Sequence, residues 1–131
     1  MKAKFAFVAA VLTLAVSAPV LAHHSFAAEF DSAKPISLTG TVTKVEWMNP
    51  HTYFYVDVQN NDGGYDNWAL ELGSPNGLSR RGWTRNSLKV GDTVKVDGFQ
   101  ARDGSFKGNA RSVVLADGKK LFSGQNDDLK N

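Results

Sequence analysis

The chain has 131 residues, which is enough for one domain, and its 15 basic and 13 acidic residues are interspersed along it. It contains no cysteine, which excludes thiol catalysis and thiolate metal sites. The nearly balanced charge argues against nucleic acid as a partner, because binding to phosphates needs a basic surface.

Residues 1–22 are predicted to be a signal peptide. Lys2 and Lys4 precede a long apolar run, and Val20-Leu21-Ala22 fits a cleavage site of small residues. We therefore expect the mature chain to begin at His23. Loss of the two lysines leaves 13 basic residues against the 13 acidic ones, and no remaining stretch is apolar enough to span a membrane.

The segment from His23 to Lys34 is predicted to be an ordered arm. Phe26 and Phe30 are spaced for one helical turn or for a clamp against the domain. Pro35 follows and argues against a longer helix.

The first strand is expected from Ile36 to Trp47. Its apolar positions change parity near Lys44, which predicts a bulge or a sharp bend. Gly40 is interpreted as the point where this long strand coils over a neighbouring strand. A tight corner at Met48-Asn49-Pro50 then leads to His51.

The later elements alternate with clear turn signals. Ser74 is a candidate N-cap, and Gly82 is a candidate C-terminal cap, for a short helix. We expect further strands at Thr52–Gln59, Tyr65–Leu72, Thr93–Gln100, Asn109–Leu115 and, briefly, Lys120–Phe122. This order predicts an all-β fold, a small five-stranded OB-like barrel with a short helix between strands 3 and 4. A β-sandwich is the main competitor, but it does not require a helix there.

Three histidines are the candidate metal ligands. A mature N-terminus at His23 would offer an α-amine and an imidazole that close a chelate. His51 or His24 would supply a third nitrogen, and such a set suits Cu(II) and tolerates Cu(I). The alternative interpretation is that His23 and His24 form a solvated chain end and that His51 makes only a hydrogen bond at a corner.

A second hypothesis concerns the face of the second and third strands, which binds ligands in OB barrels. Tyr53, Tyr55 and Trp68 are the candidate stacking residues, with core packing as the alternative. Glu71 is a candidate hydrogen-bond partner for a liganding imidazole. No nucleophile stands beside a base in a recognisable motif, so we expect no enzymatic activity.

The motifs resemble a known family. They are His23-His24-Ser25-Phe26, Gly40-Thr41-Val42, Trp47-Met48-Asn49-Pro50-His51, Trp68 with Glu71, Ser74-Pro75, Gly82-Trp83, Leu88-Lys89-Val90-Gly91-Asp92 and Ala101-Arg102-Asp103-Gly104. Together they are similar to the small exported bacterial proteins of domain-of-unknown-function family 6152. The resemblance covers nearly all of residues 23–131. It implies a periplasmic or secreted Gram-negative protein with a barrel-like domain and no established activity.

The sequence therefore predicts one OB-like barrel domain with an N-terminal arm, spanning residues 23–131. We expect it to bind a metal ion or a small molecule without turning it over, with copper as the favoured ligand. Another periplasmic protein is a further partner that fits this interpretation.

Overall fold

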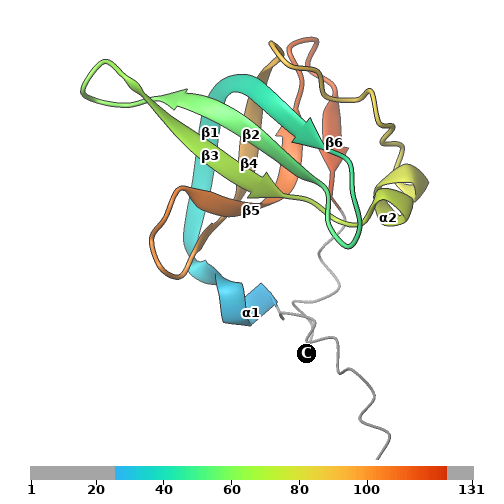
Figure 1. Cartoon of the computed structure of the whole chain (residues 1–131), viewed down its shortest axis with the longest axis horizontal. Helices are drawn as coiled ribbons and strands as arrows, with labels where there is room; N and C mark the ends of the chain where they lie inside the picture. The colour runs from blue at the N-terminus through green and yellow to red at the C-terminus, as the bar shows by residue number, and fades with distance from the viewer. Residues whose placement is uncertain (1–25, 124–131) are drawn as a thin grey trace, which may run out of the picture.

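The strands and helices follow the chain order that the sequence predicts (Figure 1). The computed structural model describes residues 26–123, so the predicted signal peptide, His23 and His24 lie outside the described residues. The elements are α1 Phe26–Glu29, β1 Phe30–Glu46, β2 Tyr53–Gln59, β3 Tyr65–Glu71, α2 Pro75–Arg80, β4 Thr93–Ala101, β5 Lys107–Val114 and β6 Lys120–Phe122.

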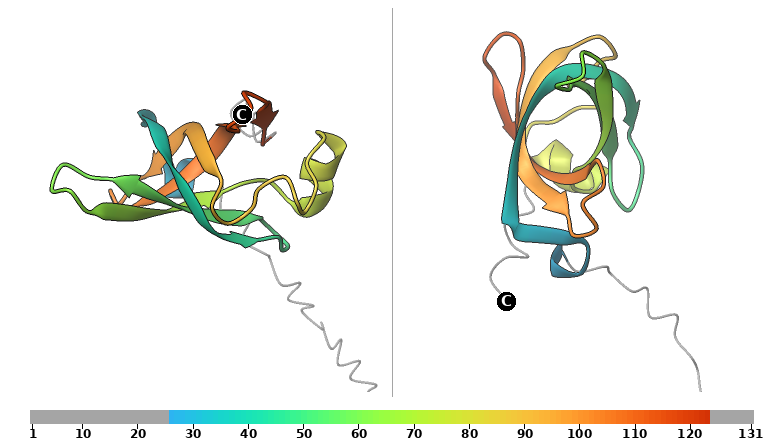
Figure 2. Two further views of the ribbon diagram at one scale, coloured as in Figure 1. Left: turned by 90° about the horizontal axis from the view of Figure 1, so that it is seen from above. Right: turned by 90° about the vertical axis from the view of Figure 1, so that its left-hand side faces the viewer.

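The strands close into a barrel. Their order in the sheet is β3-β2-β1-β4-β5-β6, and β3 also pairs in parallel with β5 from Ala69↔Lys107 to Glu71↔Asn109. This last pairing joins the edge strand β3 to β5 and closes a ring of five strands, with β6 outside it, and the ring is visible along its axis in the right-hand view of Figure 2. The OB-like barrel prediction is confirmed, with α2 placed between β3 and β4.

The first strand is longer than predicted. It begins at Phe30 rather than Ile36, because Phe30 already pairs with Ala101 of β4. Phe30 is buried, and the Phe26 ring lies 5.7 Å from the Phe30 ring and 5.6 Å from the Phe99 ring. Residues 30–34 of the expected arm are therefore barrel wall, and α1 is a single helical turn before them.

The bend predicted near Lys44 is confirmed. The pairing of β1 with β2 shifts register between Val42 and Lys44, so one extra residue enters β1. The shift explains why Val42 before it and Val45 after it both contact the core despite their odd spacing.

The interior is filled by aliphatic and aromatic side chains from every long strand and from the segment after α2. The largest fully buried ones are Phe30, Phe54, Leu70, Leu72, Leu78, Val42, Val56, Val94, Val96 and Val113. The core is continuous, which is what a domain of this size without disulfides requires.

The short helix α2 lies beside the barrel, well away from α1 (Figure 1). Ser74 caps it as predicted, because its hydroxyl accepts a hydrogen bond from the Gly77 amide at 3.2 Å. Leu78 anchors it in the core, and the Trp83 indole that follows donates to the Phe122 carbonyl at 2.9 Å. Within residues 26–123, neither helix has the length and hydrophobicity that a membrane span needs.

Candidate functional site

His51 stands at the start of β2, where the chain leaves its corner. The imidazole Nδ1 lies 3.3 Å from the Leu72 carbonyl oxygen and 3.5 Å from Oε1 of Glu71. Both neighbours are acceptors, so the neutral ring carries its proton on Nδ1 and its lone pair on Nε2. The side chain is 40% exposed, which leaves the ring accessible to a ligand from solvent.

Glu71 is a buried carboxylate that holds two neighbours at once. It lies at the end of β3 directly opposite Tyr53, and its side chain is only 7% exposed. Its Oε2 accepts a hydrogen bond of 2.7 Å from the Tyr53 hydroxyl, while its Oε1 faces His51. The structure brings the Glu71 carboxylate to 3.5 Å from the His51 ring, and the hypothesis that Glu71 hydrogen-bonds a metal-binding imidazole stays a prediction.

Tyr53 remains protonated and orients Glu71. Burial raises the pKa of Tyr53 well above its ordinary value, and the hydrogen bond to Glu71 raises it further. The negative charge of Glu29 adds a smaller increase to the pKa of Tyr53. Glu29 is itself held by an ion pair with Lys107.

A similar tyrosine–carboxylate pair lies at the next outward-facing position of β2, and none of its described contacts is to a histidine. The Tyr55 hydroxyl donates to Oε2 of Glu46 at 3.1 Å, and Glu46 also pairs with Lys44. The Lys44 ammonium lies 5.3 Å from the centre of the Tyr55 ring. This pair is more exposed than Tyr53 and Glu71, and it offers a natural comparison for them.

The three aromatic residues predicted to form a ligand face do not lie together. Tyr53 and Tyr55 point outward from β2, but Trp68 pairs with inward-facing Val56 and is 7% exposed. Its ring packs 5.4 Å from the ring of Phe106. Neighbouring positions alternate across a strand, so Trp68 belongs to the core side, and the stacking surface is reduced to the two tyrosines.

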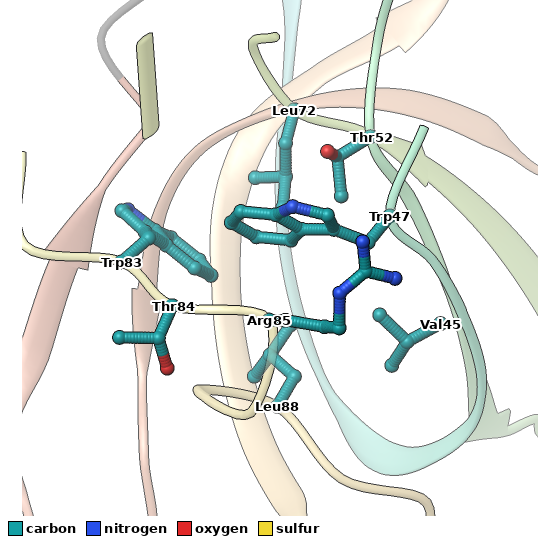
Figure 3. A pocket seen from close by; sticks show the side chains of 8 residues that line it. All are labelled: Val45, Trp47, Thr52, Leu72, Trp83, Thr84, Arg85 and Leu88. Atoms are coloured by element: carbon teal, nitrogen blue, oxygen red, sulfur yellow. The ribbon is translucent and has the colours of Figure 1, made fainter. Parts of the chain in front are cut away.

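A small apolar pocket lies on the inner side of the same corner (Figure 3). It encloses about 10 Å³, which is room for a single water molecule at most. Figure 3 shows the indoles of Trp47 and Trp83, the side chain of Arg85 and the hydroxyl of Thr52 around it. Thr52 is 1% exposed, and its Oγ1 has no hydrogen-bond partner among the described residues.

We expect replacement of Thr52 by valine to raise the free energy of unfolding by about 1 kcal/mol, because it removes a buried hydroxyl that lacks a partner. The backbone bonds of Thr52 to Gly73 and Leu72 are unchanged by it. Urea denaturation would measure the change. Thr43→Val is the matched control and should destabilise the protein, because the Thr43 hydroxyl bonds to Tyr55 and Asn67. A destabilised Thr52→Val protein would contradict the prediction and indicate a bound water.

Of the predicted metal ligands, the structure places only His51. His23 and His24 lie outside the described residues, and within residues 26–123 no three histidine, aspartate or glutamate side chains are grouped to hold a metal ion. The structure does bring His51, Glu71 and Tyr53 together. Tyr53 was missed as a partner of Glu71, although the pairing of the two strands across a tight hairpin could have suggested it.

Two comparisons with known proteins give matches. The family model described as "Family of unknown function (DUF6152)" matches residues 10–110. Among solved structures, the barrel is similar to the mitochondrial single-stranded DNA binding protein Rim1 of S. cerevisiae, with a TM-score of 0.50 and 12% identity. That match covers 63% of this chain and 93% of the other, and at this identity it shows the fold alone. No curated protein matches the chain.

Proposed function

The chain belongs to the DUF6152 family, whose function is unknown, and we propose from its own residues that it is an exported copper-binding protein. In this proposal residues 1–22 are removed on export to the periplasm. The His23 amine and imidazole then bind copper together with Nε2 of His51, and His24 is the other candidate nitrogen. The protein holds the metal and does not catalyse a reaction.

The observation that carries the proposal is the contact between Glu71 and Nδ1 of His51. Metal-bound histidines usually donate their other ring nitrogen to a carboxylate or a carbonyl, which fixes the tautomer and increases the basicity of the ligating nitrogen. His51 faces both kinds of acceptor through Nδ1, and its ring is accessible from solvent.

The position of α1 supports the rest of the ligand set. The helix ends at Glu29, which forms an ion pair with Lys107 of β5, and Lys107 pairs with Ala69, two residues before Glu71 on β3. His23 is three residues before Phe26, a distance that an extended chain covers in about 10 Å. In this proposal the mature N-terminus reaches His51 from the start of α1.

Copper titration of a protein that begins natively at His23 would test this function, with calorimetry and electron paramagnetic resonance as readouts. We expect one Cu(II) per chain with nitrogen hyperfine structure, and at least about a tenfold weaker affinity for His51→Ala. A residue added before His23 should abolish tight binding, because it removes the chelate. Equal affinities of the native protein and His51→Ala would overturn the proposed function.

A further inference from the structure

The pairing of β1 with β2 ends where the corner between them begins. Val45 pairs with Phe54, and Glu46 pairs with Tyr53, which is the last pair between the two strands. Residues 47–52 form the corner, and the chain bends at Asn49 and Pro50.

Trp47 and Thr52 both line the small inner pocket, so the two ends of the corner lie close together (Figure 3). Met48 follows Trp47, His51 precedes Thr52, and only Asn49 and Pro50 separate Met48 from His51. Consecutive Cα atoms are about 3.8 Å apart, so the Cα atoms of Met48 and His51 lie within about 11 Å of each other. The long thioether side chain of Met48 and the imidazole of His51 can therefore reach one metal ion.

Met48 is not part of the hydrophobic core. It is 48% exposed, whereas a flexible thioether usually fills gaps in a core. The sequence contains two methionines, and the other one is Met1. A thioether is a soft ligand that selects Cu(I) over harder ions, and imidazole also binds copper well.

We propose that Met48 and His51 form a Cu(I)-selective pair at the tip of the β1–β2 hairpin. This inference rests on the proposed copper function and defines the oxidation state that the site favours. The thioether sulfur and Nε2 of His51 are the two ligands from the barrel. Cu(I) is stable with few ligands. This pair therefore retains Cu(I) when the chelate formed by the His23 amine and imidazole is lost. Tight binding of Cu(II), in contrast, needs that chelate.

The experiment compares Met48→Leu, His51→Ala and the native protein, each beginning at His23. Cu(I) affinity is measured without oxygen, in ascorbate, by competition with bicinchoninate, and Ag(I) titration provides a redox-inert probe of the same chemistry. We expect Met48→Leu to weaken Cu(I) and Ag(I) binding about tenfold or more and to leave Cu(II) affinity within about twofold. Phe122→Leu is the control, because it alters an equally exposed apolar side chain far from the hairpin in sequence.

The outcomes separate the two proposals. If His51→Ala weakens Cu(II) binding but Met48→Leu leaves Ag(I) and Cu(I) affinity unchanged, the copper function stands and the Met48 ligand is wrong. If Met48→Leu weakens Cu(II) as much as Cu(I), the selectivity is wrong. If His51→Ala changes no affinity for any of the three ions, both proposals are wrong. Thermal unfolding of each variant shows that the barrel is intact, as expected for two side chains at the surface.

Discussion

Replacement of Gly40 by alanine is expected to lower the free energy of unfolding by about 3 kcal/mol or more. A Cβ atom at this position would lie 2.2 Å from the backbone oxygen of Asp57 and 2.7 Å from Cγ1 of Val56. These atoms belong to β2, which crosses β1 here, while the other edge of β1 pairs Gly40 with Val94. Because β1 is held on both sides, the clash cannot be relieved without separating strands of the barrel.

Urea denaturation followed by tryptophan fluorescence would measure the loss. Alanine also restricts the unfolded chain, which stabilises a protein by about 0.4–1 kcal/mol, so the clash must exceed this gain. Gly64→Ala is the matched control, since its Cβ would stand 3.6 Å from the Asn60 side chain, an ordinary contact. We expect the control to change stability by about 0.5 kcal/mol or less. Equal unfolding midpoints for Gly40→Ala and Gly64→Ala would contradict the prediction.

Much of the barrel could be predicted because the sequence patterns that indicate its elements are local. The parity change near Lys44, the glycine at position 40 and the Ser74 cap each identify a feature that the structure confirms. The start of β1 could not be predicted in this way. Phe30 joins the strand because it pairs with Ala101, which is distant in sequence, and no local pattern before Pro35 indicates this pairing.

The candidate site was predicted less completely, for a physical reason. The role of Glu71 depends on strand register, since Tyr53 meets Glu71 only through the pairing of β2 with β3. The same register places Trp68 on the inner side of β3, although a list of aromatic residues suggests one shared surface. Residue types therefore indicated which side chains could bind a ligand, whereas the pairing decided which of them lie together.

Glu71→Gln is expected to weaken copper binding about 10- to 100-fold, the usual cost of losing a partner of a metal-bound histidine. Glutamine has nearly the same size, and its oxygen can still accept the hydrogen bond from Tyr53. Its amide group would then face Nδ1 of His51 with a donor in place of an acceptor. The neutral ring would move its proton to Nε2 or turn away from the amide, and either change removes the ligating lone pair.

Glu46→Gln is the matched control for this prediction, because Glu46 also accepts a hydrogen bond from a tyrosine on the outer side of the barrel. No histidine contact accompanies Glu46 among its described interactions, so we expect its replacement to leave copper affinity within about twofold of the native value. Calorimetric titration with copper would measure the affinity of both variants, each beginning natively at His23. Unchanged copper affinity in Glu71→Gln would show that the carboxylate supports the fold alone, while a loss confined to this variant would identify Glu71 as the residue that prepares His51 for the metal.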